Sequence, residues 1–455
     1  MIFKIFKQFL SALKWVLPSP FNFAVFLTIL SFILAFLVGK PADESAIAYF
    51  SQLALAWFEG LWSPPFLTFS VQMMLILVLG FALAQSTLFE GLILFLIKRF
   101  PNPRVAPVLI VLMSTFLCWL NWGLGLVFSA LLVRKMGEYF SAGQIPFNYP
   151  LMGMAAYSGM VIWHGGLSGS ALLKVAEKGH LNELLPAVFG PDEVLSIRQT
   201  VFSAGNLCTS LILIFCLCGY FFWMGRKDKG LVLEIHAKRF AKWEHGKGSG
   251  AALLEYSAIW SKVLALIFLI LFILIITHFP LGLNPNTINF GLFILALGFH
   301  QHLHSFWQAL RKAMPAVTDV LIQFPFYFGI FGIFKASGLL LWFSTGFVEL
   351  GSAESLPFLS MLSAGLVNFF IPSGGGQWVL QGPVILEAAH QLAVPAPKVV
   401  LALAYGDELT NMLQPFWALP LLGITGIKPQ DLFPYAVPVF LIAAAVFSLS
   451  LFFWV

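Results

Sequence analysis

Long apolar runs, separated by short polar interruptions, fill almost the whole chain. The first lies between residues 21 and 38, and similar runs continue to the end of the sequence. A stretch of about 20 apolar residues is what a helix needs to cross the hydrocarbon core of a bilayer. The runs are continuous rather than alternating, which argues against a transmembrane barrel. The pattern therefore predicts an all-α polytopic membrane protein, whose backbone polar groups are satisfied within helices.

Composition strengthens this prediction. Of the 455 residues, 59% are hydrophobic and 10% are charged, whereas soluble globular proteins carry about 25% charged residues. Nucleic-acid binding and intrinsic disorder are excluded on the same grounds. The four cysteines lie in apolar runs without metal-ligand spacing, so we expect no metal centre and no cofactor beyond a coupling ion. The 49 Phe and 14 Trp are interpreted as lipid-facing bulk.

The Lys and Arg residues indicate the orientation, because cytoplasmic loops keep an excess of them. The most polar stretch, residues 225–250, contains seven of these basic residues. It is predicted to be a cytoplasmic linker (226–250) between a first half, residues 1–225, and a second half, residues 251–455. With the basic N-terminus also inside, the scheme places most basic residues in the cytoplasm. The lipid bilayer is thus the first partner that the sequence predicts.

The two halves share polar interruptions in the same order. Asn121 corresponds to Asn368, and Tyr157 corresponds to Tyr405, at nearly constant separations. Each half is predicted to contain a re-entrant hairpin and then a discontinuous helix, at about 105–133 and 149–177 in the first half and about 356–390 and 396–422 in the second. Because the charges give the halves opposite orientations, we expect two inverted-topology repeats. Such repeats are typical of secondary transporters, which bind substrate and coupling ion near the midplane where broken helices meet.

A run of three glycines marks the second hairpin. We expect this run not to be helical, and a helix to restart at about Gln377 with its positive N-terminal end directed at a bound carboxylate. A tight turn with close packing is the alternative. The predicted substrate-binding residues belong to this run and to the facing discontinuous helix: Ser373, Gly374, Gly375, Gly376, Gln377, His164, Ser168 and Ser170. An apolar substrate tail is expected to rest on Trp378 or Trp163, and His164 is either a core histidine or a proton relay.

Two adjacent acids, Asp407 and Glu408, lie inside a predicted span, where an unpaired charge is costly. Neighbouring side chains point about 100 degrees apart on a helix, so one of the two is expected to face the site. Unwound carbonyl groups and oxygen-bearing side chains suit a small cation. The predicted cation-binding residues are Asn121, Gly123, Asn368, Asp407, Thr410 and Asn411, and the coupling ion is Na+ or H+.

Three strings carry a resemblance to a known family: WHGGLSGS at residues 163–170, PSGGGQW at 372–378 after Asn368, and NMLQPFWALP at 411–420. Over essentially its whole length the chain resembles the short-chain fatty acid transporter family, whose namesakes serve acetoacetate and butyrate uptake in bacteria. The resemblance implies a multi-pass protein of the bacterial inner membrane with a cytoplasmic N-terminus. It also implies membership of the wider ion-transporter superfamily, with an elevator-type scaffold and transport domain, often in homodimers.

The hairpin tips depart from the superfamily pattern. Relatives place Ser-Asn-Thr at both tips, whereas this chain has Asn121-Trp122-Gly123 at the first and Ser373-Gly374-Gly375 at the second. The sodium sites of those relatives are therefore only loosely transferable to this chain.

The leading hypothesis is a secondary active transporter rather than an enzyme, taking up acetoacetate- or butyrate-type monocarboxylates by symport with Na+ or H+ and alternating access. Two alternatives remain open. His164-Gly165-Gly166 is similar to an esterase oxyanion loop and raises a membrane-embedded acyl hydrolase, although the Gly-x-Ser-x-Gly pattern is absent around Ser168. The other alternative is an anion channel, against which paired broken helices argue.

Overall fold

The computed structural model describes residues 19–453 apart from 101, 229, 236–249, 251 and 280–284. The described chain consists of helices, irregular connections and an isolated bridge between Phe147 and Leu231. Within it, six helices are long and apolar enough to cross a membrane: Pro20–Gly39, Ala46–Leu83, Ala204–Lys227, Ala258–His278, Val320–Ser337 and Pro429–Phe453. The prediction of an all-α polytopic membrane protein is confirmed. The expected cytoplasmic N-terminus and most of the predicted linker 226–250 lie outside the described residues.

The first half contains the helices α2 (Pro20–Gly39), α3 (Ala46–Leu61), α4 (Pro64–Ala84), α5 (Thr87–Arg99), α6 (Ala106–Leu120), α7 (Trp122–Ala142), α8 (Tyr149–Tyr157), η1 (Ser158–Val161), α9 (Ser170–Lys174), α10 (His180–Leu184) and α11 (Ala204–Lys227). The second half contains α12 (Ala252–Glu255), α13 (Ala258–His278), α14 (Pro285–Phe299), α15 (Leu303–Ala313), η2 (Met314–Val317), α16 (Thr318–Ser337), α17 (Leu339–Glu349), α18 (Leu356–Phe370), α19 (Gly374–Gln391), α20 (Ala396–Asn411), α21 (Pro415–Thr425), α22 (Pro429–Leu432), η3 (Phe433–Tyr435) and α23 (Ala436–Phe453).

The halves present their elements in the same order. Each has a helix with a break, α4–α5 or α16–α17, followed by a helical pair with a short tip, α6–α7 or α18–α19. An interrupted helix comes next, α8–η1–α9 or α20–α21, and a single helix, α11 or α23, closes the series. This is the order that the repeat hypothesis expects, and the inverted relation of the halves stays a prediction.

Local chemistry explains where these helices stop and restart. The break between α4 and α5 falls at Gln85 and Ser86, and that between α16 and α17 falls at Gly338, whose φ of 70° suits glycine. At the first hairpin tip, Asn121 adopts an extended backbone and its side chain caps α7. In the second interrupted helix, Pro415 begins α21, a position at which the missing N–H costs nothing.

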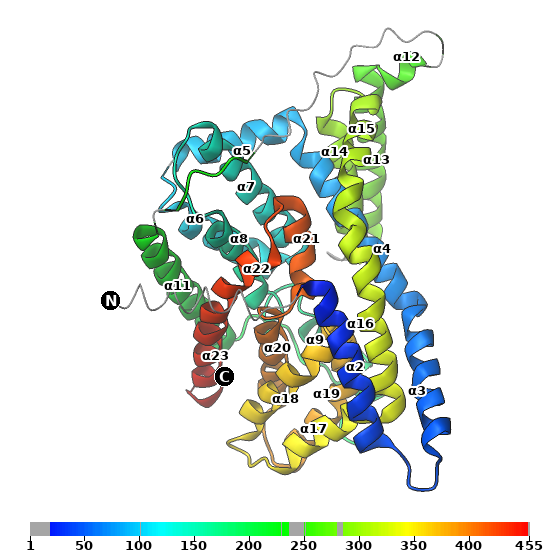
Figure 1. The fold of residues 1–455 in the computed structure, drawn as a ribbon. Coiled ribbons are helices and arrows are strands. Elements are labelled where there is room, and N and C mark those ends of the chain that lie inside the picture. The colour runs from blue at the N-terminus through cyan, green and yellow to red at the C-terminus, as the bar shows by residue number, and fades with distance from the viewer. Residues whose placement is uncertain are drawn as a thin grey trace.

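Helices α2, α3, α4 and α16 form a tall wall on the right of Figure 1, with α13, α14 and α15 beside its upper part. Small residues let α3 and α16 approach closely. A methyl group at Gly332 would overlap the carbonyl oxygen of Ala56, and one at Gly329 would lie 2.5 Å from the Trp57 ring. Close backbone contact of this kind stabilises helix pairs in membranes, where lipid removes the hydrophobic driving force.

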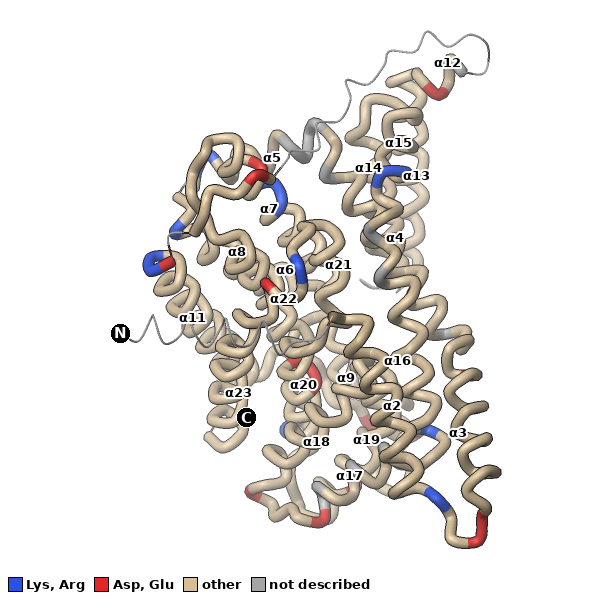
Figure 2. Tube along the Cα trace, viewed as in Figure 1, with Lys and Arg blue, Asp and Glu red and all other residues tan. Residues whose placement is uncertain are grey.

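The two helical pairs lie in different parts of the molecule. Figure 1 shows α6 and α7 in the upper half and α18 and α19 in the lower half, with α21 beside α7 and α20 beside α18. The acidic positions of α20 lie near the middle of the view in Figure 2, away from most of the other charged positions. Elements of both halves contact α20: α18 from the second half, and η1 and α9 from the first.

Candidate functional site

The irregular segment 162–169 connects η1 to α9 and carries His164. Glycine makes its path possible, because a methyl group at Gly169 would overlap the carbonyl oxygen of His164. A methyl group at Gly166 would likewise overlap the carbonyl oxygen of Trp119, near the tip of the first hairpin. Leu167 donates its backbone N–H to that same Trp119 oxygen at 2.7 Å. The segment is thus folded tightly on itself and against α6.

A buried histidine and a buried acid form the centre of the site. His164 Nδ1 lies 2.6 Å from Asp407 Oδ2, and both side chains are at most 1% exposed. His164 Nε2 accepts the backbone N–H of Ala171 at 3.2 Å. Because Nε2 acts as an acceptor, the ring proton lies on Nδ1 and is donated to Asp407. The geometry therefore favours one tautomer of the imidazole, with its N–H directed at Asp407.

Glu408 reaches the same segment through the backbone. Its Oε2 accepts the N–H groups of His164, at 2.8 Å, and of Gly165, at 3.4 Å. Both adjacent acids therefore contact segment 162–169, which presents a side chain to Asp407 and main-chain donors to Glu408. Helical periodicity alone could not show this, since the partner is an irregular segment and not a second helix. That only one of the two acids faces a binding site stays a prediction.

The second hairpin meets this segment through its glycines. Ser373 caps α19 and accepts the N–H of Gly376 at 3.3 Å. A methyl group at Gly374 would lie 2.7 Å from His164 Cε1, and one at Gly375 would lie 3.8 Å from Ser170 Cβ. The structure therefore brings together residues of the second hairpin and of the first interrupted helix, as the substrate-site prediction requires.

The glycine run is helical, contrary to the sequence expectation. Gly374, Gly375 and Gly376 form the first turn of α19, so the helix starts three residues before Gln377. A first turn suits glycines that follow a good cap, because its N–H groups lack intrahelical partners in any case. The positive end of the helix is consequently at Ser373, directly beside His164.

Other predicted residues have structural partners. Asn121 Oδ1 accepts the N–H groups of Gly123 and Leu124, at 3.0 and 3.1 Å, and Ser168 Oγ accepts that of Trp122 at 3.1 Å. Both side chains thus accept N–H groups at the tip of the first hairpin. Gln377 is fully buried and donates to the carbonyl oxygen of Ala364 at 2.8 Å.

Trp378 is also fully buried. Its indole N–H donates to His180 Nε2 at 2.9 Å, which ties α19 to the short helix α10.

The predicted cation ligands of the second half form one network. Asn368 Nδ2 lies 2.8 Å from the carbonyl oxygen of Asp407, 3.0 Å from Thr410 Oγ1 and 2.6 Å from Asn411 Oδ1. Gln414 donates to the carbonyl oxygen of Asn368 at 2.7 Å. Within the described part of the chain, three buried oxygens of this network, Asn368 Oδ1, Asp407 Oδ1 and Gln414 Oε1, have no hydrogen-bond partner, and neither has Asn411 Nδ2. Buried acceptors usually have a partner, so these three oxygens are candidate ligands for a cation.

Two tyrosines brace the breaks across the halves. Tyr157 donates its hydroxyl to the carbonyl oxygen of Asn411 at 2.6 Å and lies 3.3 Å from that of Gln414. Tyr405 donates to Asn206 Oδ1 at 2.9 Å, and Asn206 in turn donates to the carbonyl oxygen of Gly165 at 2.8 Å. Each tyrosine thus supports the break in the other half. The sequence showed the pair only as matching positions in the two halves.

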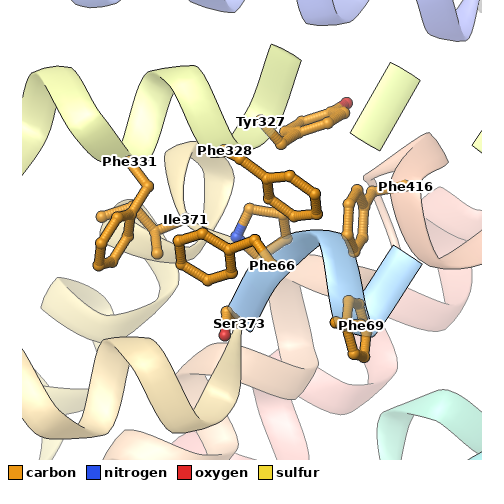
Figure 3. Close-up of a pocket in the computed structure, with 9 residues that line it drawn as sticks. Phe66, Phe69, Tyr327, Phe328, Phe331, Ile371, Ser373 and Phe416 are labelled. Carbon is orange, nitrogen blue, oxygen red and sulfur yellow. The ribbon is translucent and has the colours of Figure 1, made fainter. Parts of the chain in front are cut away.

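An aromatic cavity of about 220 Å³ lies beside the second hairpin. Its lining residues come from α4, α16, the hairpin tip and α21: Phe66, Phe69, Tyr327, Phe328, Phe331, Ile371, Pro372, Ser373 and Phe416 (Figure 3). The interpretation of the phenylalanines as lipid-facing bulk is therefore wrong for these positions. Their clustering arises from the packing of α16 against α4 and α21, which a single sequence does not reveal. Neither Trp163 nor Trp378 is among the lining residues.

Comparison with known proteins adds independent information. The model of the short chain fatty acid transporter family matches residues 1–454. A protein of Escherichia coli K12 and one of Haemophilus influenzae, both named as candidate short-chain fatty acid transporters, are each 30% identical to this chain over 96% of both sequences.

Among solved structures, the YdaH transporter of Alcanivorax borkumensis aligns with a TM-score of 0.42 and 16% identity over 96% of this chain and 98% of its own. The family model matches the entire described chain. The chain belongs to the short chain fatty acid transporter family.

Proposed function

We propose that this protein takes up short-chain monocarboxylates, of the acetoacetate and butyrate type, by symport with Na+ or H+ and alternating access in the bacterial inner membrane. One observation carries the proposal. The capped N-terminus of α19 opens at Ser373 onto an aromatic cavity, and a buried His164–Asp407 pair lies directly behind it. An anion with a short apolar tail and a cation are the two ligands that such an arrangement suits.

The carboxylate of the substrate would bind at the first turn of α19. This helix has 18 residues, and its N-terminus carries the equivalent of roughly half a positive charge. The N–H groups of Gly374 and Gly375 and the Ser373 hydroxyl are donors that suit an anion. Among the described residues that line the cavity there is no Lys or Arg, so a second carboxylate would have no cationic partner there. This favours monocarboxylates over dicarboxylates.

The cation would bind at the network around Asn368. Asp407 Oδ1 and Asn368 Oδ1 are buried acceptors, and Thr410 and Asn411 add further oxygens. Oxygen ligands of this kind suit a hard cation, and protonation of Asp407 would satisfy the same group. A cation here would also offset the negative charge of Asp407 in a site without solvent, and the substrate anion would bind more readily beside it.

The arrangement disfavours the hydrolase alternative. His164 uses one ring nitrogen toward Asp407 and the other toward the N–H of Ala171. Ser168 Oγ already accepts the N–H of Trp122. A general base must be within reach of the nucleophile that it activates, and His164 has no free nitrogen for Ser168. The membership of a transporter family agrees with a protein that is not an enzyme.

Uptake in proteoliposomes tests the proposal. Purified protein would be reconstituted, and accumulation of labelled butyrate would be followed with an imposed Na+ gradient, an imposed H+ gradient, or neither. Accumulation above the external concentration would exclude a channel, and an ester of butyrate that stays intact with the purified protein would exclude an acyl hydrolase. Uptake that no cation gradient drives would contradict the proposal.

A matched pair of variants locates the cation site. Asp407→Asn keeps the shape of the side chain and removes its charge, so gradient-driven uptake should be lost. Asp192→Asn removes an acid whose side chain is 83% exposed and paired with Lys178, so uptake should be unchanged. Normal accumulation in Asp407→Asn would sink the assignment of Asp407.

A further inference from the structure

We propose that the aromatic cavity is the subsite for the acyl tail and that Phe416 limits the length of the tail. The inference rests on the proposed function, because it assumes that a carboxylate binds at the start of α19. It adds a binding site for a straight hydrocarbon chain of a few carbons, made largely by residues of α4 and α16.

The cavity joins one polar end to an apolar interior. Ser373 caps α19 and also lines the cavity, so the carboxylate position and the cavity share a boundary. Apart from Ser373 and Tyr327, the lining side chains are hydrocarbon. A short fatty acid has the same division, since its head is charged and its tail is apolar. Burial of the tail would stabilise the complex by roughly 0.8 kcal/mol for each methylene group.

The size of the cavity suits a short chain. Its volume is about 220 Å³, whereas pockets for drug-sized ligands span about 300–1,000 Å³. A tail of a few carbons can therefore enter without displacing a wall.

The walls are rigid because the rings pack on one another. Phe66 stacks on Phe328 with centroids 4.8 Å apart and contacts Phe331 edge-to-face at 4.9 Å. Ring pairs of this kind contribute beyond the area that they bury. A tail that is too long would have to separate these pairs, which adds an energetic cost to its binding.

The two sides of the cavity differ in their distance from the carboxylate position. A methyl group at Gly376 would lie 3.7 Å from the ring of Phe331, which places Phe331 beside the first turn of α19. Phe416 lies on the other side in Figure 3, with Phe69. Its ring stacks on Phe324 at 4.1 Å and meets Tyr327 edge-to-face at 5.0 Å. Phe416 is therefore a fixed end wall for a tail that starts at Ser373.

Uptake of a series of labelled straight-chain monocarboxylates, from acetate to octanoate, tests the inference in proteoliposomes. Wild-type uptake should be highest for short acids and fall as methylenes are added. Phe416→Leu opens the end wall and should move the preferred length upward by one or two carbons. The ratio of long-acid to short-acid uptake should change about fourfold for each methylene accommodated, which is the transfer free energy of one methylene group expressed as a ratio.

Two further variants keep the test decisive. Phe215 on α11 is 80% exposed, so Phe215→Leu should leave the length profile unchanged. Phe331→Leu alters the opposite wall beside α19 and should weaken uptake of all the acids alike, without a shift in preferred length.

The outcomes separate the two proposals. If the wild type accumulates no carboxylate, the proposed function fails. If the wild type accumulates butyrate and a folded Phe416→Leu protein has the wild-type length profile, the tail subsite alone is wrong. Should Phe416→Leu not fold, competition of unlabelled hexanoate and octanoate against butyrate in Phe416→Met replaces it, and an unaltered order of inhibition overturns the inference.

Discussion

Substitution of Gly374 by alanine should impair transport, whereas the same substitution at the next glycine of α19, Gly375, should not. The added methyl group would lie 2.7 Å from His164 Cε1 and 3.3 Å from each ring nitrogen, whereas carbon atoms in contact are about 3.5–4.0 Å apart. The imidazole cannot turn aside freely, because Asp407 holds Nδ1 and the N–H of Ala171 holds Nε2. Either the ring or the hairpin must therefore move.

The expected loss of uptake in Gly374→Ala follows from the contacts that a shift of the His164 ring would break. Overpacking of a filled interior costs about 1–3 kcal/mol, and alanine returns about 0.5–1 kcal/mol through its better helix propensity. A displaced ring also loses a hydrogen bond to a charged group, worth about 1.5–3 kcal/mol. If this loss falls on the transport-competent state, uptake should decrease about 10- to 100-fold.

The neighbouring glycine provides the control. A methyl group at Gly375 would lie 3.8 Å from Ser170 Cβ and 3.9 Å from its Oγ, which is ordinary contact. Gly375→Ala should therefore transport butyrate at close to the wild-type rate, while Gly374→Ala is impaired. Both proteins would be assayed by proteoliposome uptake and normalised to the folded fraction from size-exclusion chromatography. Equal loss in both variants, or normal uptake in Gly374→Ala, would refute the contact between the hairpin and His164.

Three further predictions concern residues outside this contact. Tyr157→Phe removes the hydroxyl hydrogen bond to the buried carbonyl oxygen of Asn411, worth about 1 kcal/mol. The apparent affinity for the coupling ion should fall about 5-fold in uptake titrations, and an unchanged ion dependence would count against the brace. Gly332→Ala should cost about 1–3 kcal/mol of stability, because its methyl group overlaps the Ala56 carbonyl oxygen; thermal melting should show this loss. Burial and Lys174 lower the pKa of His180 below 6.5, so the protonated form is disfavoured in the folded protein and stability should decline as pH falls from about 6.5. Melting temperatures between pH 7.5 and 5 would check this decline, and His180→Gln should abolish it.

Several interruptions of the helices fall at residues that the sequence marks. Asn121 lies at the first hairpin tip, and the second tip falls at residues 371–373. The interrupted helices stop after Tyr157 and after Asn411, inside the predicted ranges. These positions are predictable because glycine, proline, asparagine and serine act locally, through backbone freedom and capping, whatever surrounds them.

The partners of the interruptions could not be predicted in the same way. Asp407 and Glu408 both contact segment 162–169, although helical geometry suggested that one of them would face elsewhere. Gly374 is helical because Ser373 caps the turn. Phe416 gave no sign of lining a cavity, since in an apolar chain a wall residue and a lipid-facing residue look alike.

The sequence by itself determined that the chain is a bundle of membrane helices, where several of those helices break, and which family it belongs to. The length and apolarity of the runs and the helix-breaking residues act within about 20 residues of each position, so they can be read locally. Only the tertiary structure decided that His164 meets Asp407 and Gly374, that Tyr157 supports the break after Asn411, and that rings of α4, α16 and α21 enclose one cavity. The contacts of His164 and Tyr157 join residues more than 200 positions apart. They depend on how whole helices cross and pack, which no local pattern encodes.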